Sequence, residues 1–196
     1  MARVGEVVRE TKETRVDVRL DLDGTGKADL RSGVPFLDHM LDQLARHGRF
    51  DLRVHATGDL AIDAHHTTED VGICLGVALD RALGDRRGLA RFGHAYAPLD
   101  EALGFCCVDF SGRGFLVFDA PFEGATVGAF PLELVEDFFQ AVAVNSRSTW
   151  HVQSVRGRNL HHRAESIFKA SALALAQAIA LDPRRAGEVP STKGAL

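Results

Sequence analysis

The chain has 196 residues, of which 45% are hydrophobic and 26% are charged, and its formal net charge is −4. These values are ordinary for one globular domain or two small ones, and they exclude a disordered or fibrous protein. The acidic balance, with one Trp and one Tyr, argues against a nucleic-acid binder, because such proteins need a basic face and stacking aromatic side chains.

The location of the protein is predicted from its apolar segments and its cysteines. The uncharged stretch over residues 170–181 is too short to cross a bilayer, and residues 1–6 do not lead into an apolar secretory signal. Three cysteines cannot all pair, and two of them, Cys106 and Cys107, are neighbours. This pattern is typical of thiols in a reducing cytosol, so we expect a cytoplasmic protein without a membrane partner.

The predicted elements follow the same order twice along the chain. Alternating apolar residues around the glycine-containing segment 21–26 predict a β-hairpin, and the segment 109–114 repeats that pattern. A helical spacing of apolar residues then predicts amphipathic helices over 34–41 and 132–139. Strands follow over 50–56 and 148–155, and each half closes with a helix that includes residues 71–83 or 167–181.

Two histidine motifs anchor this repeat. His65-His66-Thr67-Thr68-Glu69 and His161-His162-Arg163-Ala164-Glu165 share the pattern H-H-x-x-E, spaced 96 positions apart, and each opens one of the closing helices. We therefore expect an α+β fold of two duplicated half-domains that form one compact unit. Each half should have a small mixed or antiparallel sheet with two helices packed on one face. The expected divisions are residues 1–90, residues 91–186 and a substrate-binding tail over 187–196.

The spacing within each motif favours metal binding. Successive residues at a helix start project about 100° apart, so the two histidines of a pair point in different directions, and the glutamate can share an ion with either. Two motifs then predict a two-metal site built from both. Imidazole and carboxylate donors without thiolate argue against structural zinc and favour six-coordinate Mn²⁺ or Fe²⁺. His39, on the helix ahead of the first motif, is a further candidate ligand.

Cationic residues predict that the substrate carries an anionic group. Arg91, Arg113, Lys169 and the segment Ser191-Thr192-Lys193 offer guanidinium, ammonium and hydroxyl donors, which together suit a phosphate. Lys169 follows His161 by about two helical turns, which places it on a similar face of the helix. A phosphate held near the metals is the prediction.

Two other functions are alternatives to this one. Asp21-Leu22-Asp23-Gly24-Thr25 looks like the nucleophile motif of haloacid-dehalogenase-type phosphatases, but the preceding residues alternate in polarity, whereas that fold needs a continuous apolar strand. The repeat also replaces Asp23 by Ser111, so we interpret the segment as a turn. The second alternative is a non-catalytic protein whose histidines only cross-link subunits through metal ions. It would need no phosphate pocket, and Arg91→Ala would then change stability alone.

The chain resembles the imidazoleglycerol-phosphate dehydratase family over essentially its whole length. The segments that carry the resemblance are Arg9–Thr14, Pro35–Leu41, His65–Asp70, Arg91–Gly93, Ser111–Arg113, His161–Glu165 and Pro190–Gly194. The doubled histidine motif together with this tail is highly specific. The resemblance implies a lyase of histidine biosynthesis that removes water from imidazole glycerol phosphate, a phosphorylated imidazole, to give imidazole acetol phosphate. It also implies a homo-oligomer of 24 subunits, with active sites between subunits and two Mn²⁺ ions in each site.

The resemblance also implies the site residues. The implied metal ligands are His39, His65, His66, Glu69, His161, His162 and Glu165, with Asp137 as a further candidate. Substrate contacts would fall on Gln43, Arg91, Arg113, Lys169, Ser191 and Lys193, and the catalytic carboxylates would be Glu13 and Glu165. One departure concerns Asp137, the counterpart of His39 in the second half, where some family members carry a histidine; a carboxylate can bind Mn²⁺ but reaches less far.

This chemistry is compatible with a two-metal site. The carbon–hydrogen bond that must break has no carbonyl to activate it, but an imidazole held as an imidazolate between two cations can expel the hydroxide from the adjacent carbon. The conjugated intermediate makes the next carbon acidic, so a carboxylate can remove its proton, and the enol then tautomerises to the ketone. We expect Glu13 to move that proton, because it is acidic and lies outside the metal motifs.

Overall fold

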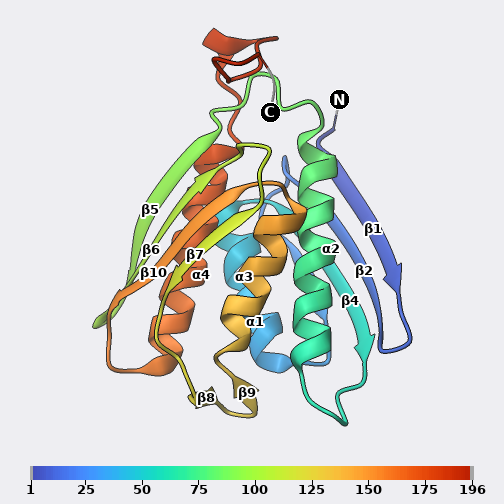
Figure 1. Ribbon diagram of the computed structural model, residues 1–196, viewed down its shortest axis with the longest axis vertical. Helices are drawn as coiled ribbons and strands as arrows, with labels where there is room; N and C mark the ends of the chain where they lie inside the picture. The colour runs from blue at the N-terminus through green and yellow to red at the C-terminus, as the bar shows by residue number, and fades with distance from the viewer. Residues whose placement is uncertain (1, 195–196) are drawn as a thin grey trace.

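The computed structural model describes residues 2–194, which form two similar halves built from the same succession of elements (Figure 1). The first half contains β1 (Val4–Glu10), β2 (Thr14–Asp21), β3 (Ala28–Arg31), α1 (Pro35–Gly48), β4 (Asp51–Gly58) and α2 (His65–Leu83). The second half contains β5 (Phe92–Leu99), β6 (Ala102–Asp109), β7 (Phe115–Asp119), the short strands β8 (Thr126–Val127) and β9 (Phe130–Pro131), α3 (Leu134–Asn145), β10 (Thr149–Arg156), α4 (Leu160–Ala178) and a 3₁₀ turn (Pro183–Arg185). The predicted α+β duplication is confirmed.

Each half has one four-stranded mixed sheet. The strand order is β1-β2-β4-β3 in the first half and β5-β6-β10-β7 in the second, and the last strand of each order runs parallel to its neighbour. The other pairs are antiparallel, and β2 alternates between buried and partly exposed positions as a strand with one face in a core must.

The two predicted hairpins around residues 21–26 and 109–114 are wrong. The strands on either side of these segments, β2 with β3 and β6 with β7, do not pair, because β4 or β10 lies between them. The first segment is instead fixed to the start of β4, where the Asp51 carboxylate accepts hydrogen bonds from the Thr25 and Lys27 amides at 2.7 and 2.9 Å. The hairpins that do form are β1-β2 and β5-β6.

Helices α1, α2, α3 and α4 lie between the two four-stranded sheets (Figure 1). Each half contributes one long helix to its own sheet, α2 against β1 and β2, and α4 against β5 and β6. The shorter helices pack across the halves, α1 on α4 and α3 on α2. Aromatic side chains close the centre, where the rings of Phe139 and Phe168 lie 5.0 Å apart and Trp150 is buried. The halves therefore share one core.

A glycine brings each sheet unusually close to its long helix. A Cβ atom on Gly5 would overlap the carbonyl oxygen of Ala78, and one on Gly93 would overlap that of Ala174. The two pairs occupy equivalent positions in the halves, so the close approach is a shared property of the duplication. In the part of the chain that the structure describes, no helix has the length and apolar character that a membrane crossing requires.

A buried cation lies where the two halves meet. Arg86, which is 2% exposed, donates hydrogen bonds to the Asp80 carboxylate at 2.6 Å and to the backbone oxygens of Ser146 and Arg147 at 2.9 and 3.3 Å. These bonds join the end of α2 to the connection between α3 and β10. Removing the guanidinium would leave several polar groups without partners.

Candidate functional site

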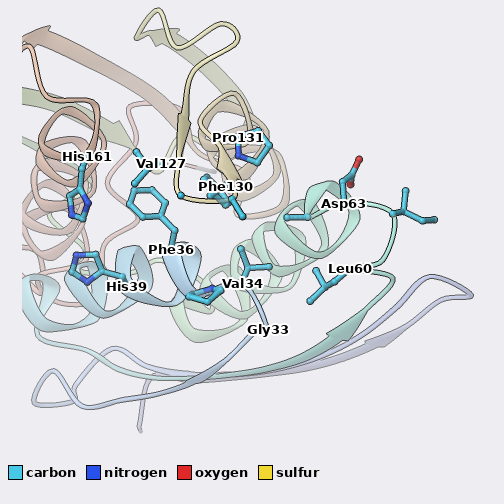
Figure 2. A pocket seen from close by; sticks show the side chains of 15 residues that line it. Gly33, Val34, Phe36, His39, Leu60, Asp63, Val127, Phe130, Pro131 and His161 are labelled. Atoms are coloured by element: carbon cyan, nitrogen blue, oxygen red, sulfur yellow. The ribbon is translucent and has the colours of Figure 1, made fainter.

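Two helices bring three candidate metal ligands together. The Asn159 side chain caps α4 by accepting hydrogen bonds from the His161 and His162 amides, which places both histidines in the first turn of the helix. Glu165 follows His161 by four residues and so lies on the same face, where its Oε2 is 3.0 Å from His161 Nε2. His39 on α1 contributes its own Nε2 at 3.1 Å from the same oxygen. Figure 2 shows the rings of His39 and His161 next to each other, with their centres 5.4 Å apart.

These three residues suit a divalent ion of the manganese type. One donor atom from each of His39, His161 and Glu165 lies within 4.8 Å of the other two, which is the spread that ligands of one ion require. The donors are imidazole and carboxylate without thiolate, a set that favours Mn²⁺ or Fe²⁺ over a structural zinc. The set therefore fits the predicted metal.

Glu165 carries its negative charge in a partly desolvated position. Burial opposes ionisation, but hydrogen bonds from Lys169, His161 and His39 outweigh it and hold the pKa of the Glu165 carboxyl below its usual value. The Lys169 ammonium lies 2.6 Å from Glu165 Oε1. The structure thus pairs a predicted phosphate contact directly with a predicted metal ligand.

Gln43 extends this cluster along α1. It follows His39 by one helical turn, and its Oε1 lies 3.2 Å from Nε2 of His47, one turn further on. Burial and the charge of Lys169 lower the pKa of His47. The α1 face that includes Gln43 therefore runs beside the α4 face that includes Lys169.

The first motif has a matching but looser arrangement at the start of α2. The Asp137 carboxylate on α3 lies 3.6 Å from His65 Nδ1. Asp137 is thus placed beside the first motif as His39 is placed beside the second. Glu69 is exposed and forms no ion pair within residues 2–194. The first motif thus lacks the dense contacts that surround Glu165.

The second histidine of each motif is held by a carboxylate. His66 Nδ1 lies 2.9 Å from Asp59 Oδ2, and His162 Nδ1 lies 2.9 Å from Glu101 Oε2. The hydrogen bond to Asp59 raises the pKa of His66, against the opposing effect of burial. A backbone hydrogen bond from Asn159, followed by the His162 contact, lowers the pKa of Glu101 to about 2.

The rings within each histidine pair point in different directions. The planes of His65 and His66 meet at 84°, and those of His161 and His162 meet at 88°. Such rings cannot readily direct their nitrogen atoms at one ion, so each motif can serve two.

Glu13 lies in the turn between β1 and β2, beside the first motif. Its Oε2 is 3.9 Å from His66 Nδ1, and its side chain is 56% exposed. The turn is fastened to α2 by Asp70, whose carboxylate accepts hydrogen bonds from the hydroxyl of Thr14 and, at 2.6 Å, from Arg9. Glu13 is therefore held near a candidate ligand while its own carboxylate stays accessible.

Most of the predicted phosphate contacts gather at the opposite end of the molecule. Arg91 donates hydrogen bonds to the Asp109 carboxylate at 2.7 Å and to the backbone oxygen of Pro190 at 2.7 Å. Arg113 follows in the loop after β6, where its backbone and side chain contact Ser111. Arg91 thereby ties the C-terminal tail, with Ser191 and Lys193, to the same end; residues 195 and 196 of that tail lie outside the described residues.

The length of α4 separates this end from the histidines. The Arg91 amide donates to the oxygen of Ala178 in the last turn of α4, whereas His161 lies in the first. Seventeen residues of helix span about 26 Å at 1.5 Å per residue. One small substrate cannot contact both groups within a single chain.

A groove adjoins the histidines at their own end. It has a volume of about 710 Å³ and lies between the start of α1, the loop before α2 and the β8-β9 ribbon (Figure 2). Its lining is largely apolar and includes Phe36, Phe130 and the strongly exposed Ile62. Two candidate metal ligands, His39 and His161, belong to its lining.

Sequence reasoning missed the carboxylates that hold the histidines. Glu101 could have been found from the repeat, since it is the counterpart of Glu13, 88 positions later. Asp59 has no such signal, because the loop before α2 is longer than the loop before α4. Asp70 was visible only as the residue that follows the first motif.

Comparisons with known proteins give one consistent result. A family model described as imidazoleglycerol-phosphate dehydratase matches residues 32–175. The imidazoleglycerol-phosphate dehydratases of Cupriavidus metallidurans and Ralstonia nicotianae are each 56% identical to this chain, over 99% and 100% of it, and both are covered over their full length. The crystal structure of imidazoleglycerol-phosphate dehydratase from Staphylococcus aureus is similar with a TM-score of 0.82 and 38% identity, over 91% of this chain and 99% of that one. The corresponding structure from Pyrococcus furiosus has a TM-score of 0.83 and 35% identity, over 97% and 100%.

Proposed function

The chain belongs to the imidazoleglycerol-phosphate dehydratase family of hydro-lyases, which serve a step of histidine biosynthesis, and from this membership we propose its reaction in detail. The protein removes water from imidazole glycerol phosphate to give imidazole acetol phosphate, with two Mn²⁺ ions in each active site. Besides the family, the observation that carries the proposal is the cluster of His39, His161 and Glu165, whose donor atoms lie within 4.8 Å of one another.

The proposed metal ligands come from both motifs. His39, His161 and Glu165 form one group, His65 and Asp137 form a second, and His66, Glu69 and His162 complete the set. When bound, two Mn²⁺ ions would supply positive charge that stabilises the substrate ring as an imidazolate. The protein's part is to hold the ring nitrogens at the correct positions, and the carboxylate partners of His66 and His162 support that role.

The phosphate of the substrate is proposed to bind at the other end of a chain. Arg91, Arg113, Ser191 and Lys193 supply charged and hydroxyl donors there, while Lys169 and Gln43 would contact substrate from the α1–α4 side. Contacts far from the reacting carbons orient the ring, because binding energy gained at the phosphate offsets the entropy lost on positioning.

Glu13 is the proposed proton carrier. Loss of hydroxide from the carbon next to the ring leaves the neighbouring carbon acidic, and the Glu13 carboxylate removes its proton to form the enol. The same carboxyl can return a proton as the enol becomes the ketone. The exposure of Glu13 and its place beside His66 support this role, and Glu165, also predicted to be catalytic, is better suited to binding metal because Lys169 already pairs with it.

The separation of the two ends supports an assembly. Since about 26 Å of helix lies between Arg91 and His161, we propose that each site takes its phosphate contacts and its histidines from different subunits of a 24-subunit homo-oligomer. The apolar groove with exposed Ile62 offers a surface for such contacts. The divisions at residues 90/91 and 186/187 and a cytoplasmic location, which suits three free thiols, belong to the same proposal.

Turnover of imidazole glycerol phosphate tests the reaction. Purified protein is stripped with a chelator, and the ketone product is measured before and after Mn²⁺ is added. Activity that appears only with Mn²⁺ supports the substrate and the metal together. Bound metal without turnover would contradict the substrate, and the lack of both would contradict the site.

Arg113→Ala tests the phosphate end separately. We expect KM to rise about tenfold or more while the Mn²⁺ content stays normal, because one charge-assisted contact to phosphate is lost. Loss of metal in this variant would show that Arg113 has a structural role instead.

A further inference from the structure

Two glutamates at equivalent turns of the duplication have different contacts. Glu101, between β5 and β6, reaches His162 Nδ1 at 2.9 Å and accepts backbone hydrogen bonds from Arg158 and Asn159 at 3.0 and 2.8 Å. Glu13, its counterpart between β1 and β2, stays 3.9 Å from His66 Nδ1, which is beyond hydrogen-bond distance. The repeat alone would give both glutamates the same contact.

Asp59 occupies the contact that Glu13 leaves open. It lies in the six-residue loop 59–64 between β4 and α2, and its Oδ2 is 2.9 Å from His66 Nδ1. The corresponding loop of the second half, residues 157–159, contains Gly157, Arg158 and Asn159 and so has no carboxylate. The acidic partner of His66 is therefore an addition specific to the first half.

The contact decides which nitrogen of His66 can bind metal. An ionised carboxylate can only accept hydrogen bonds, so Nδ1 of His66 carries the hydrogen. The lone pair of Nε2 is then free to bind a metal ion. Glu101 imposes the same choice on His162. The bond to His66 is the only hydrogen bond of the Asp59 side chain among residues 2–194, because its other oxygen, Oδ1, is buried without a partner.

We propose that Asp59 is a positioning residue that holds Nδ1 of His66, as Glu101 does for His162, and that it thereby keeps the Glu13 carboxylate free for proton transfer. The inference rests on the proposed function, in which His66 is a metal ligand and Glu13 moves a proton. It adds an account of how one duplicated glutamate became available for chemistry while the other remained a support.

The fastening of the Glu13 turn completes this account. Asp70 binds Thr14 and Arg9 and so holds the turn on α2 without using Glu13. The equivalent positions of the second half are Ser166, Ala102 and Ala97, which cannot form that network. There the turn is held by Glu101 itself.

Mn²⁺ binding to chelator-stripped protein, measured by calorimetry without substrate, tests the proposal. Asp59→Ala should weaken one class of Mn²⁺ sites about tenfold, because loss of the carboxylate behind a ligating histidine typically costs 10- to 100-fold in metal affinity. Asp59→Asn, which keeps an acceptor oxygen, should fall between wild type and Asp59→Ala. It also serves if the alanine variant fails to fold. Asp63→Asn removes a charge from the same loop without touching a ring and should change the affinity less than twofold.

A cycle with Glu13→Gln separates the proposal from a merely structural role. Glu13→Gln alone should leave Mn²⁺ affinity unchanged, whereas the same change in the Asp59→Ala background should weaken it further, because Glu13 can then turn to His66 Nδ1. At saturating Mn²⁺, Asp59→Ala should lower kcat about tenfold with little change in KM, because the Glu13 carboxylate is then drawn to His66 Nδ1 and is no longer free for proton transfer.

The possible failures are distinguishable. Suppose that the wild type binds Mn²⁺ and turns over substrate. An Asp59→Ala variant of unchanged Mn²⁺ affinity, or a strictly additive cycle, would then overturn the role of Asp59 and leave the proposed function standing. Wild type that binds no Mn²⁺ overturns the proposed function and this inference with it.

Discussion

The two halves share a backbone plan but differ in the polar contacts around their motifs. Glu165 is buried and has three partners, whereas the matching Glu69 is exposed and has no ion pair among the described residues. The β5-β6 turn is fixed to its motif helix by Glu101, and the β1-β2 turn is fixed to its motif helix by Asp70. A duplicated fold can thus keep its packing while each copy specialises its charged groups.

The difference has a physical basis in what each kind of contact demands. Packing between sheet and helix depends on close fit at many positions, so an altered glycine or core residue affects the whole half. A charged contact near the surface depends on two or three side chains, and it can be replaced by another carboxylate that reaches the same atom. The first set constrains both halves alike, and the second set is free to diverge.

Arg86→Met should have the largest effect on stability. It removes a buried cation from the junction of the two halves, and this contact is not part of the repeat. We expect a loss of about 4 kcal/mol in the free energy of unfolding, since the oxygens of Ser146 and Arg147 lose this donor and Asp80 keeps only the longer contact to Arg147 at 3.2 Å. Urea unfolding at matched protein concentration measures it. Arg87→Met, at the exposed neighbour, is the control, and an equal loss there would contradict the role assigned to Arg86.

Gly5→Ala and Gly93→Ala test the shared packing. Each added Cβ would overlap a helix carbonyl oxygen, so each variant should lose about 3 kcal/mol, and the two losses should be similar. Val8→Ala and His94→Ala change exposed positions on the same strands and should have little effect. A large loss at only one glycine would show that the halves are packed differently.

Asp70→Asn tests the fastening found only in the first half. It should cost about 1–2 kcal/mol of stability, because a buried charged hydrogen-bond network is weakened. It should also lower kcat about tenfold by loosening the Glu13 turn, with Mn²⁺ affinity retained. The counterpart of Asp70 in the second half is Ser166, whose hydroxyl bonds only within its own helix. Ser166→Ala should therefore leave kcat unchanged. A normal kcat in Asp70→Asn would show that the fastening of the Glu13 turn by Asp70 is not needed for catalysis.

Thiol labelling should show the smallest difference between the halves. Burial raises the pKa of Cys74 to about 11 and that of Cys106 to about 12, so neither forms the reactive thiolate near neutral pH. Only the partly exposed Cys107 should be modified in the folded protein at pH 8, and slowly, whereas the unfolded chain should react at all three positions. Mass spectrometry identifies the modified residues, and rapid modification of Cys106 would refute the expected burial.

Much of the fold could be predicted from the repeat, and the exceptions have clear causes. The motifs marked the starts of α2 and α4 because helix-opening residues and apolar periodicity are local signals. Strand pairing is not local: alternation around residues 21–26 indicated strands but could not show that β4, later in the chain, would lie between β2 and β3. Glu101 was missed for the same reason, because its contact with His162 joins the β5-β6 turn to α4 across intervening chain. Asp59 was missed because the loop before α2 is longer than its counterpart before α4, so the repeat gives no signal for it.

The span of α4 has a consequence for how damage to this protein would be inherited. A chain altered at His161 keeps an intact Arg91 end, and a chain altered at Arg91 keeps intact histidines. In the proposed assembly, two such inactive chains expressed together would form some sites that draw only on their sound ends, and activity would partly return. The activity would then depend on which chains are mixed in the oligomer, so that two defective alleles of the same gene could complement each other.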